Sequence, residues 1–384
     1  MLVAEPVLAA LAGEQLVWVV GGAVRDLLLG RVPGDLDLVV EGDAVAVARR
    51  AAARLGGEVL VHDRFGTATV RGASGSFDLA GSRRERYPEA GALPVVELGA
   101  PLDDDLARRD FTVNALALRL ADGELRGVTE ARADLDACLL RVLHDASFHD
   151  DPTRLLRLAR YAGRLGFAAE PHTAALAGAA VSAGALATVS GERLGAELRL
   201  LAREPQPGAL VALAAHGLGQ ALLPGFGVDL ELTERALALC PPDAQAAAVA
   251  LGSALRHAPA GELAARLRGL ALPAPEAEAI AAAAQLDELL AALGGARPSA
   301  ADALLTRRPL EAAVLATAAG SEAARDWLER ARHLSVAIGG AELLAEGLSG
   351  PAVGRGLRAA RAALLDGDAP DADAQLAAAL AAAG

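Results

Sequence analysis

The stretch VWVVGGAVRDLLLGRVPGDLDLVV, residues 17–40, decides how the first part of the chain folds. Its β-branched and aromatic start favours a strand. Gly21-Gly22 then leads into a helical segment, and a Pro-Gly turn leads into a second strand. Side chains two apart on a strand point to the same face. We therefore expect Asp35 and Asp37 to lie side by side, with Leu36 and Leu38 facing the core.

Two aligned carboxylates beside a glycine turn indicate a particular chemistry. The two charges repel, and their natural complement is Mg²⁺, which prefers hard oxygen ligands. A pair of such ions can stabilise the attacking and leaving oxygens of a phosphoryl transfer. Gly21 and Gly22 would let a triphosphate approach the backbone at the start of the helix. A surface strand with solvated acids would explain Asp35 and Asp37 alone, but the whole arrangement favours a functional site.

The rest of the 384-residue chain divides into a mixed part and a helical part. The first ~130 residues alternate strands and helices, and the remainder reads as almost wholly helical. We expect strands at 16–20, 36–40, 58–61, 66–71 and 75–80, and helices at 23–29, 43–55 and near 111–120. The pattern predicts an α+β fold, with a small mixed β-sheet and helices followed by an all-α region. The expected domains are 1–140, 141–224 and 225–384.

Composition narrows the class of protein. The net charge of −13 argues weakly against a nucleic-acid partner, yet the chain has no lysine, and 13 of its 36 arginines fall between Arg83 and Arg164. No apolar run approaches the roughly 20 residues of a membrane span, and the N-terminus lacks the basic start of a signal peptide. Cys138 and Cys240 read as reduced, packed thiols. We expect a cytoplasmic protein with no membrane association and no evident obligate protein partner.

The 17–40 stretch resembles the signature of the DNA polymerase β-type nucleotidyltransferase superfamily. The form GG-x-VRDLLLG with D-L-D is similar to the bacterial class II CCA-adding tRNA nucleotidyltransferase and poly(A) polymerase family. The resemblance implies a nucleotidyltransferase head at 1–140, a helical neck at 141–224, and a body and tail at 225–384 that bind tRNA. It implies catalytic carboxylates that hold two Mg²⁺ ions, and a nucleotide held near the glycine turn. By this resemblance the catalytic residues are Asp35, Asp37 and Asp78, the metal ligands are Asp35 and Asp37, and the first nucleotide-binding residues are Gly21, Gly22 and Arg25. A turn-capping role for Asp78 is the alternative.

The segment DDDLARRDFTVNALAL, residues 103–118, resembles the family's second motif. Two guanidinium groups beside a metal site can neutralise phosphate oxygens. We expect Arg109 to bind phosphate, Asp110 to accept a hydrogen bond from a ribose hydroxyl, and Asn114 to lie at the matching offset on the following helix. The alternative is a charged helix N-terminus in which Asp110 complements the helix dipole.

The segment HDDPTRLLRLARYAGRLGF, residues 149–167, resembles the family's base-selecting motif, with Asp150 where the family commonly has Glu. On a helix, Asp151 and Arg154 would share a face. Asp can accept from the exocyclic amine of cytosine or adenine, and Arg can donate to the adjacent acceptor. The alternative is an ordinary ion pair. Arg157 and Arg160 extend a basic stripe, with Arg154 and Arg164, that suits either phosphates or solvent.

Weaker similarities cover other segments. Residues 83–98 correspond to a mobile loop in the family, 191–198 to a helix that braces the nucleotide pocket, and 338–367 to tail helices that hold tRNA. Residues 128–135 depart from the family's usual turn. The resemblance implies template-independent addition of C and/or A from CTP and ATP to the tRNA 3′ end, with release of pyrophosphate. A poly(A) polymerase, an enzyme that adds only CC or only A, and a non-catalytic RNA-binding protein remain alternatives.

Overall fold

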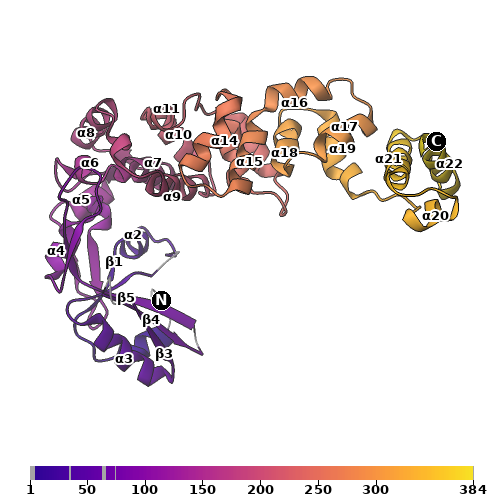
Figure 1. Cartoon of the computed structure of the whole chain (residues 1–384). Helices are drawn as coiled ribbons and strands as arrows, with labels where there is room; N and C mark the ends of the chain where they lie inside the picture. The colour runs from indigo at the N-terminus through magenta and orange to yellow at the C-terminus, as the bar shows by residue number, and fades with distance from the viewer. Residues whose placement is uncertain (1–4, 34–35, 63–65, 74, 384) are drawn as a thin grey trace. The chain divides into compact units, whose positions relative to one another are not determined.

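The computed structural model describes residues 5–33, 36–62, 66–73 and 75–383. The chain forms two compact units, Met1–Ser190 and Gly191–Gly384 (Figure 1). The first unit contains a seven-stranded sheet with helices, and the second is built from helices. The expected α+β fold with a mixed sheet and a helical remainder is confirmed.

The large sheet has the strand order β3-β4-β5-β2-β1-β8-β9. Its strands are β1 (Val17–Val20), β2 (Leu38–Val40), β3 (Glu58–His62), β4 (Thr67–Gly72), β5 (Gly75–Gly81), β8 (Leu116–Arg119) and β9 (Leu125–Gly127). Strands β2 and β5 run parallel, with Leu38 opposite Leu79, and the other neighbours are antiparallel. The sheet is therefore mixed, as predicted, and β1 and β2 lie near its centre.

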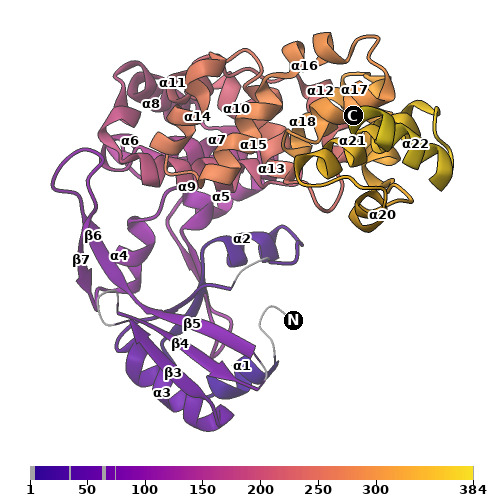
Figure 2. The same cartoon turned by 45° about the vertical axis from the view of Figure 1, so that its right-hand side comes forward.

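Helices pack against the sheet, whose central strands β1 and β2 are apolar and buried along their whole length. Helix α3 (Ala44–Leu55) lies against one face (Figure 2), and its Ala48 and Ala51 are fully buried. Asp43 caps this helix by accepting from the Ala46 amide at 2.9 Å. Helix α4 (Leu102–Ala107) contributes Leu102 and Leu106 to a cluster that contains Trp18 of β1. The strands that precede the glycine turn and the acids are thus held by core packing.

Two sequence predictions in this region were wrong in detail. The segment near 111–120 is not a helix: it forms a single 3₁₀ turn, η2 (Thr112–Asn114), and then β8. The hydrogen-bonded pairing of β8 with β1 satisfies the backbone of this segment and overrides its helical pattern. The second strand begins at Leu38, not at Leu36, although the Val20 amide still donates to the Asp37 carbonyl at 3.0 Å. Asp37 therefore stands at the entrance to β2, and Asp35 lies outside the described residues.

The segment expected to be a mobile loop is largely structured. Strands β6 (Arg83–Arg86) and β7 (Val95–Leu98) form a two-stranded ribbon. Between them, Gly91 has a φ of 69°, and its amide donates to the His149 carbonyl at 3.3 Å. A Cβ on Gly91 would lie 2.3 Å from the Thr188 hydroxyl. Only glycine fits this close approach, so the loop packs against the helical part of the first unit.

The remaining elements of the first unit are mostly helical. They are α1 (Glu5–Ala10), α2 (Gly22–Leu28), α5 (Ala131–Asp136), β10 (Leu139–Leu140), α6 (Ser147–Asp150), α7 (Thr153–Leu165), β11 (Ala168–Ala169), α8 (Pro171–Ser182) and η3 (Ala185–Thr188). Asp151 is not on the same helix as Arg154, contrary to expectation, because α6 ends at Asp150 and α7 starts after Pro152. The residue before a proline avoids the helical region, and Asp151 has φ −135° and ψ 91°.

The second unit consists of short, closely packed helices. They are α9 (Gly191–Ala202), α10 (Gly208–Ala215), α11 (Leu218–Leu222), α12 (Leu230–Leu239), α13 (Ala246–Ala254), α14 (Ala260–Gly269), α15 (Ala274–Ala284), α16 (Leu286–Leu293), α17 (Pro298–Leu305), α18 (Leu310–Ala318), α19 (Glu322–Glu329), η4 (Ala331–His333), α20 (Gly340–Ala345), α21 (Pro351–Asp366) and α22 (Ala372–Ala383). Asp302 of α17 accepts from Trp327 at 2.9 Å and from Arg361 of α21 at 2.7 Å. In the described part of the chain, no helix is both long and apolar enough to cross a bilayer.

Candidate functional site

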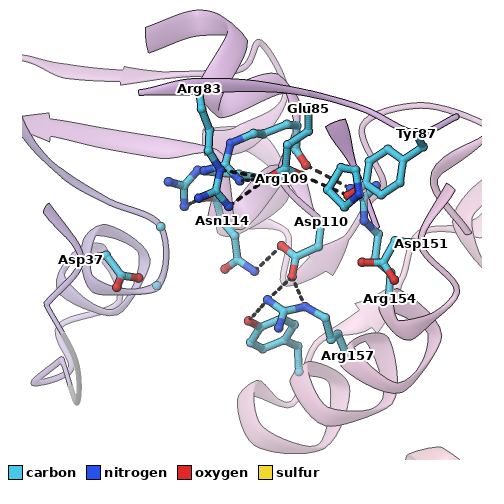
Figure 3. A pocket seen from close by; sticks show the side chains of 15 residues that line it. Asp37, Arg83, Glu85, Tyr87, Arg109, Asp110, Asn114, Asp151, Arg154 and Arg157 are labelled. Atoms are coloured by element: carbon cyan, nitrogen blue, oxygen red, sulfur yellow. Dashed lines mark hydrogen bonds and ion pairs between the residues drawn. The ribbon is translucent and has the colours of Figure 1, made fainter. Parts of the chain in front are cut away.

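A cavity of about 370 Å³ opens in the first unit (Figure 3), within the size range of small-molecule sites. Its lining residues are Gly21, Gly22, Asp37, Arg83, Glu85, Tyr87, Pro94, Arg108, Arg109, Asp110, Asn114, Asp151, Arg154, Arg157 and Tyr161. Nine of these were predicted from three separate stretches of sequence, and the fold brings them together. The predicted residues Arg25, Asp78 and Arg160 do not line this cavity, and Asp35 lies outside the described residues.

The glycine turn sits directly against an arginine. Gly21 has φ 70° and ψ −133°, and it precedes the first turn of α2. A Cβ at this position would lie 2.6 Å from Nη1 of Arg109. Gly21 therefore meets two demands, since glycine reaches this backbone conformation without strain and leaves room for the guanidinium.

The acidic end of the cavity is formed by Asp37, which is exposed. Continuing the pairing of Leu38 with Leu79 by one residue sets Asp37 beside Asp78, on the face opposite those leucines. Asp78 accepts a hydrogen bond from the Thr69 hydroxyl at 2.6 Å. Carboxylate oxygens of this kind fit Mg²⁺. Among the described residues, which do not include Asp35, no three potential ligands are grouped closely enough to hold a metal.

A buried carboxylate that sequence reasoning missed holds the arginines of the cavity wall. Asp105 of α4 is fully buried and accepts from Nε and Nη2 of Arg108 at 2.9 and 2.8 Å. Its other oxygen accepts from Nη2 of Arg109 at 3.1 Å. The spacing of i to i+3 and i+4 in DLARR was the available signal. The Nε atom of Arg109 is buried and has no hydrogen-bond partner among the described residues.

Asp110 is the centre of a hydrogen-bond network. One carboxylate oxygen accepts from the Phe111 amide at 2.8 Å and from Nδ2 of Asn114 at 2.9 Å. The other accepts from Nε and Nη2 of Arg157 at 2.8 and 2.7 Å. Burial alone would raise the pKa of Asp110, but the charge of Arg157 and these bonds outweigh it and lower the pKa to about 2. Three hydrogen bonds and the ion pair with Nη2 of Arg157 therefore hold this carboxylate.

Arg25 takes part in this network from behind the cavity. The side chain is 2% exposed, and its Nη1 donates to Oδ1 of Asn114 at 2.6 Å. Its Nε and Nη2 donate to Asp26 at 2.8 and 2.7 Å. Arg25 therefore orients Asn114, which in turn donates to Asp110.

At the opposite end, Asp151 and Arg154 come together although they lie on different elements. Asp151 accepts from the amide and hydroxyl of Thr153 at 3.0 and 2.6 Å. Arg154 is 3% exposed and donates to the Ser147 hydroxyl at 2.6 Å and to the Arg108 carbonyl at 3.0 Å. Its guanidinium carbon lies 5.8 Å from the ring centre of Tyr87.

Strand β6 and the residue that follows it supply two cavity residues that sequence reasoning did not single out, Glu85 and Tyr87. The Tyr87 hydroxyl donates to Glu85 at 3.1 Å, and Glu85 also pairs with Arg108 at 2.9 Å. Burial, reinforced by the charge of Glu85, raises the pKa of Tyr87 to about 12. Their alternate positions in RRERY, which place both on one face of a strand, were the signal that could have found them.

The basic stripe of α7 is not simply a solvated face. Arg154 is buried and Arg157 pairs with Asp110. Arg160 lies over the Tyr161 ring at 5.1 Å, and Arg164 reaches Asp26 at 3.6 Å. Arg157 and Arg164 therefore join α7 to the strand-containing part of the first unit through Asp110 and Asp26, whereas Tyr161, which Arg160 contacts, belongs to α7 itself.

Known proteins are similar in sequence to part of this chain. Residues 17–141 match the family described as "Poly A polymerase head domain". An A-adding tRNA nucleotidyltransferase of Halalkalibacterium halodurans is 47% identical over 197 residues, which cover 50% of this chain and 46% of the relative. A CC-adding tRNA nucleotidyltransferase of Deinococcus radiodurans is 44% identical over 237 residues, covering 60% of this chain and 62% of the relative. Residues 17–141 therefore form a head domain of the poly(A) polymerase type, and the chain is similar to tRNA nucleotidyltransferases.

A solved structure extends the likeness to nearly the whole fold. The structure described as a complex of a CCA-adding enzyme with ATP has a TM-score of 0.81 and 28% identity, and the match covers 98% of this chain and 94% of that one. In contrast, the sequence matches span only 46% and 62% of the length of the two relatives named above.

Proposed function

We propose that the protein is a template-independent tRNA nucleotidyltransferase that adds C and/or A to the tRNA 3′ end. The observation that carries this proposal is the single cavity in which Asp37, the Arg108–Arg109 pair and the Asp151–Arg154 pair converge. One end suits metal-bound phosphates, the wall supplies cations, and the other end offers a hydrogen-bond pattern for a base. The A-adding and CC-adding activities named for the two relatives support the same substrates.

In the proposed reaction, the 3′-oxygen of the RNA forms a bond to the α-phosphorus of CTP or ATP. The bond from that phosphorus to the β-phosphate bridging oxygen breaks, and pyrophosphate leaves. Asp35 and Asp37, with Asp78 assisting, would hold two Mg²⁺ ions. When bound, these ions would supply charge neutralisation and a lowered pKa for the attacking hydroxyl. Gly21 and Gly22 would let the phosphates approach the start of α2.

The arginines of the wall would bind and orient the triphosphate. Asp105 fixes the guanidinium groups of Arg108 and Arg109, so these cations are in place before the nucleotide arrives. Arg157 is held by Asp110 in the same way. We assign Arg25, Asn114 and Arg160 supporting roles, because each contacts a residue that lines the cavity.

Asp151 and Arg154 would replace a template base. Cytosine and adenine both present an amine beside a ring acceptor, which an aspartate and an arginine can match together. The bonds of Arg154 to Ser147 and to the Arg108 carbonyl set the orientation of its guanidinium. The side chain at Asp150, one methylene shorter than the family's usual Glu, lies outside this cavity lining.

For the remainder of the chain we propose the division into head (1–140), neck (141–224), and body and tail (225–384), with the helices of the body and tail binding tRNA. The working location would be the cytosol, where tRNA and nucleoside triphosphates meet, without an obligate protein partner.

The deciding experiment is incubation with tRNA transcripts that lack all, part or only the last nucleotide of the CCA end, with CTP and ATP supplied separately. A CCA-adding enzyme should add C from CTP to the transcripts that lack a C, and A from ATP to the transcript that lacks only the last nucleotide. An enzyme that adds only CC or only A should perform just one of these two steps. A long A tract would support a poly(A) polymerase. RNA binding without any product would overturn the enzymatic proposal.

A further inference from the structure

The chain has two tyrosines, and both line the cavity. Their hydroxyl groups differ in one respect. The Tyr87 hydroxyl donates its proton to Glu85 at 3.1 Å. The Tyr161 oxygen accepts from Nη2 of Arg157 at 3.0 Å, and the described residues offer no acceptor for its proton. Tyr161 thus brings an unused hydrogen-bond donor to the cavity although the residue is only 9% exposed.

The Tyr161 ring is held from several sides. The guanidinium carbons of Arg25, Arg157 and Arg160 lie 5.3, 5.5 and 5.1 Å from the ring centre. The ring of Phe111 meets it edge to face, with 5.9 Å between ring centres. Burial raises the pKa of the phenol, so the hydroxyl keeps its proton. The donor is therefore fixed in place and present throughout the physiological pH range.

Asp110, the residue that the sequence suggested for a ribose hydroxyl, is already engaged by neighbouring donors. Its carboxylate accepts from the Phe111 amide, Asn114 and Nε of Arg157, and it forms an ion pair with Nη2 of Arg157 at 2.7 Å. Figure 3 shows Asp110 between Asp37 at one end and Asp151 and Arg154 at the other. A nucleotide with phosphates at the first end and its base at the second would place its sugar beside Asp110 and Arg157. The Tyr161 hydroxyl lies 3.0 Å from that same arginine.

We propose that Tyr161 is a specificity-determining residue whose hydroxyl donates a hydrogen bond to a ribose hydroxyl of the incoming nucleotide. This inference rests on the proposed nucleotide site. Asp110 acts as a positioning residue, because it holds Arg157 and Arg157 holds the phenol oxygen. A ribose hydroxyl both donates and accepts, so it can satisfy the phenol proton, whereas the deoxy analogue leaves that buried donor without a partner.

The test is Tyr161→Phe, which keeps the ring and its contacts with the three arginines and removes only the hydroxyl. Binding of ATP, 2′-deoxy-ATP and 3′-deoxy-ATP is measured by equilibrium titration, and single-nucleotide addition by kcat/KM. Losing one hydrogen bond to a buried donor should reduce discrimination against one of the two deoxy analogues roughly tenfold. The analogue affected identifies the hydroxyl. Preference for A or C over U and G should not change.

Tyr87→Phe is the matched control, because its hydroxyl already has an acceptor in Glu85. Tyr87→Phe should discriminate between ATP and its two deoxy analogues as well as the wild type does. If Tyr161→Phe leaves both ratios within twofold of wild type, or weakens ATP and both analogues equally, the hydroxyl does not read the sugar and the inference is overturned. A protein that adds no nucleotide but shows the shift in binding would support Tyr161 while refuting the proposed reaction.

Discussion

Gly21 and Arg109 lie so close together that a Cβ on Gly21 would lie 2.6 Å from Nη1 of Arg109. The contact joins the turn before α2 to the cation wall. Arg109 is also held by Asp105 at 3.1 Å, so it has little freedom to withdraw.

Gly21→Ala should therefore lower kcat/KM for nucleotide addition at least tenfold by displacing Arg109. The matched control is Gly123→Ala. Gly123 has a φ of 77°, and its Cβ would have nothing within 4 Å. Both variants should lose roughly 1–3 kcal/mol of stability, because both positions have a positive φ; urea unfolding measures this loss. Equal activity of the two variants would show that the Gly21 contact is not needed.

Asp37→Ala should abolish nucleotide addition, because removal of a metal ligand costs several kcal/mol of transition-state stabilisation, or at least a hundredfold in rate. The fold should be retained, since Asp37 is exposed. Asp103→Ala removes another exposed carboxylate of the first unit and should remain near wild type. Activity of Asp37→Ala within tenfold of wild type would contradict the metal assignment.

Arg154→Ala should lower discrimination for the correct base over UTP and GTP about tenfold, since a good bidentate contact is worth roughly 1–3 kcal/mol. Misincorporation of all four nucleotides measures this. Arg164→Ala, on the same helix but outside the cavity lining, should not affect base choice. An equal loss for every nucleotide would mean that Arg154 only positions Tyr87 and the Arg108 carbonyl.

Asp110→Asn should destabilise the protein in a pH-dependent manner. The folded-state pKa of Asp110 is lowered from 3.8 to about 2, so its ionised form contributes stability above pH 4 that is lost as the pH falls toward 2. The shift corresponds to roughly 2 kcal/mol. Urea unfolding of the two proteins should differ by about this amount at pH 7 and pH 5, and the difference should narrow below pH 4. A difference that stays constant down to pH 3 would argue against the charge of Asp110 as its source.

Binding of tRNA should weaken with salt despite the net charge of −13, because the contacts would be local arginine–phosphate pairs. From low to physiological ionic strength, the logarithm of the binding constant should fall linearly with the logarithm of the salt concentration. A flat response would exclude arginine–phosphate contacts as the main source of affinity.

Much of the site could be predicted because its residues lie in short, patterned stretches. The glycine turn and its flanking strands could be predicted from the local sequence. Arg109, Asp110 and Asn114 could be predicted from the motif resemblance. The helix predicted near 111–120 was wrong because β8 pairs with β1, about 100 residues earlier in the chain. A local pattern carries no information on such a distant partner.

The arginines of α7 show the same limit. Their spacing indicated a basic stripe, but their partners Asp26 and Asp110 come from other parts of the chain. Without those contacts a buried network and a solvated face look alike. Asp105 and Tyr161 were overlooked for a related reason. Their roles depend on which hydrogen bonds their side chains make, and only the three-dimensional structure shows these bonds.

The fifteen residues that line the cavity in the described part of the chain include no histidine, cysteine or lysine. Histidine is the side chain whose ordinary pKa falls near neutrality, whereas arginine keeps its charge throughout. The charge of the arginines that line the cavity therefore stays constant across the neutral pH range. A rate that changes between pH 6 and pH 8 would report on the substrate, whose terminal phosphate titrates near 6, more than on the protein that holds it.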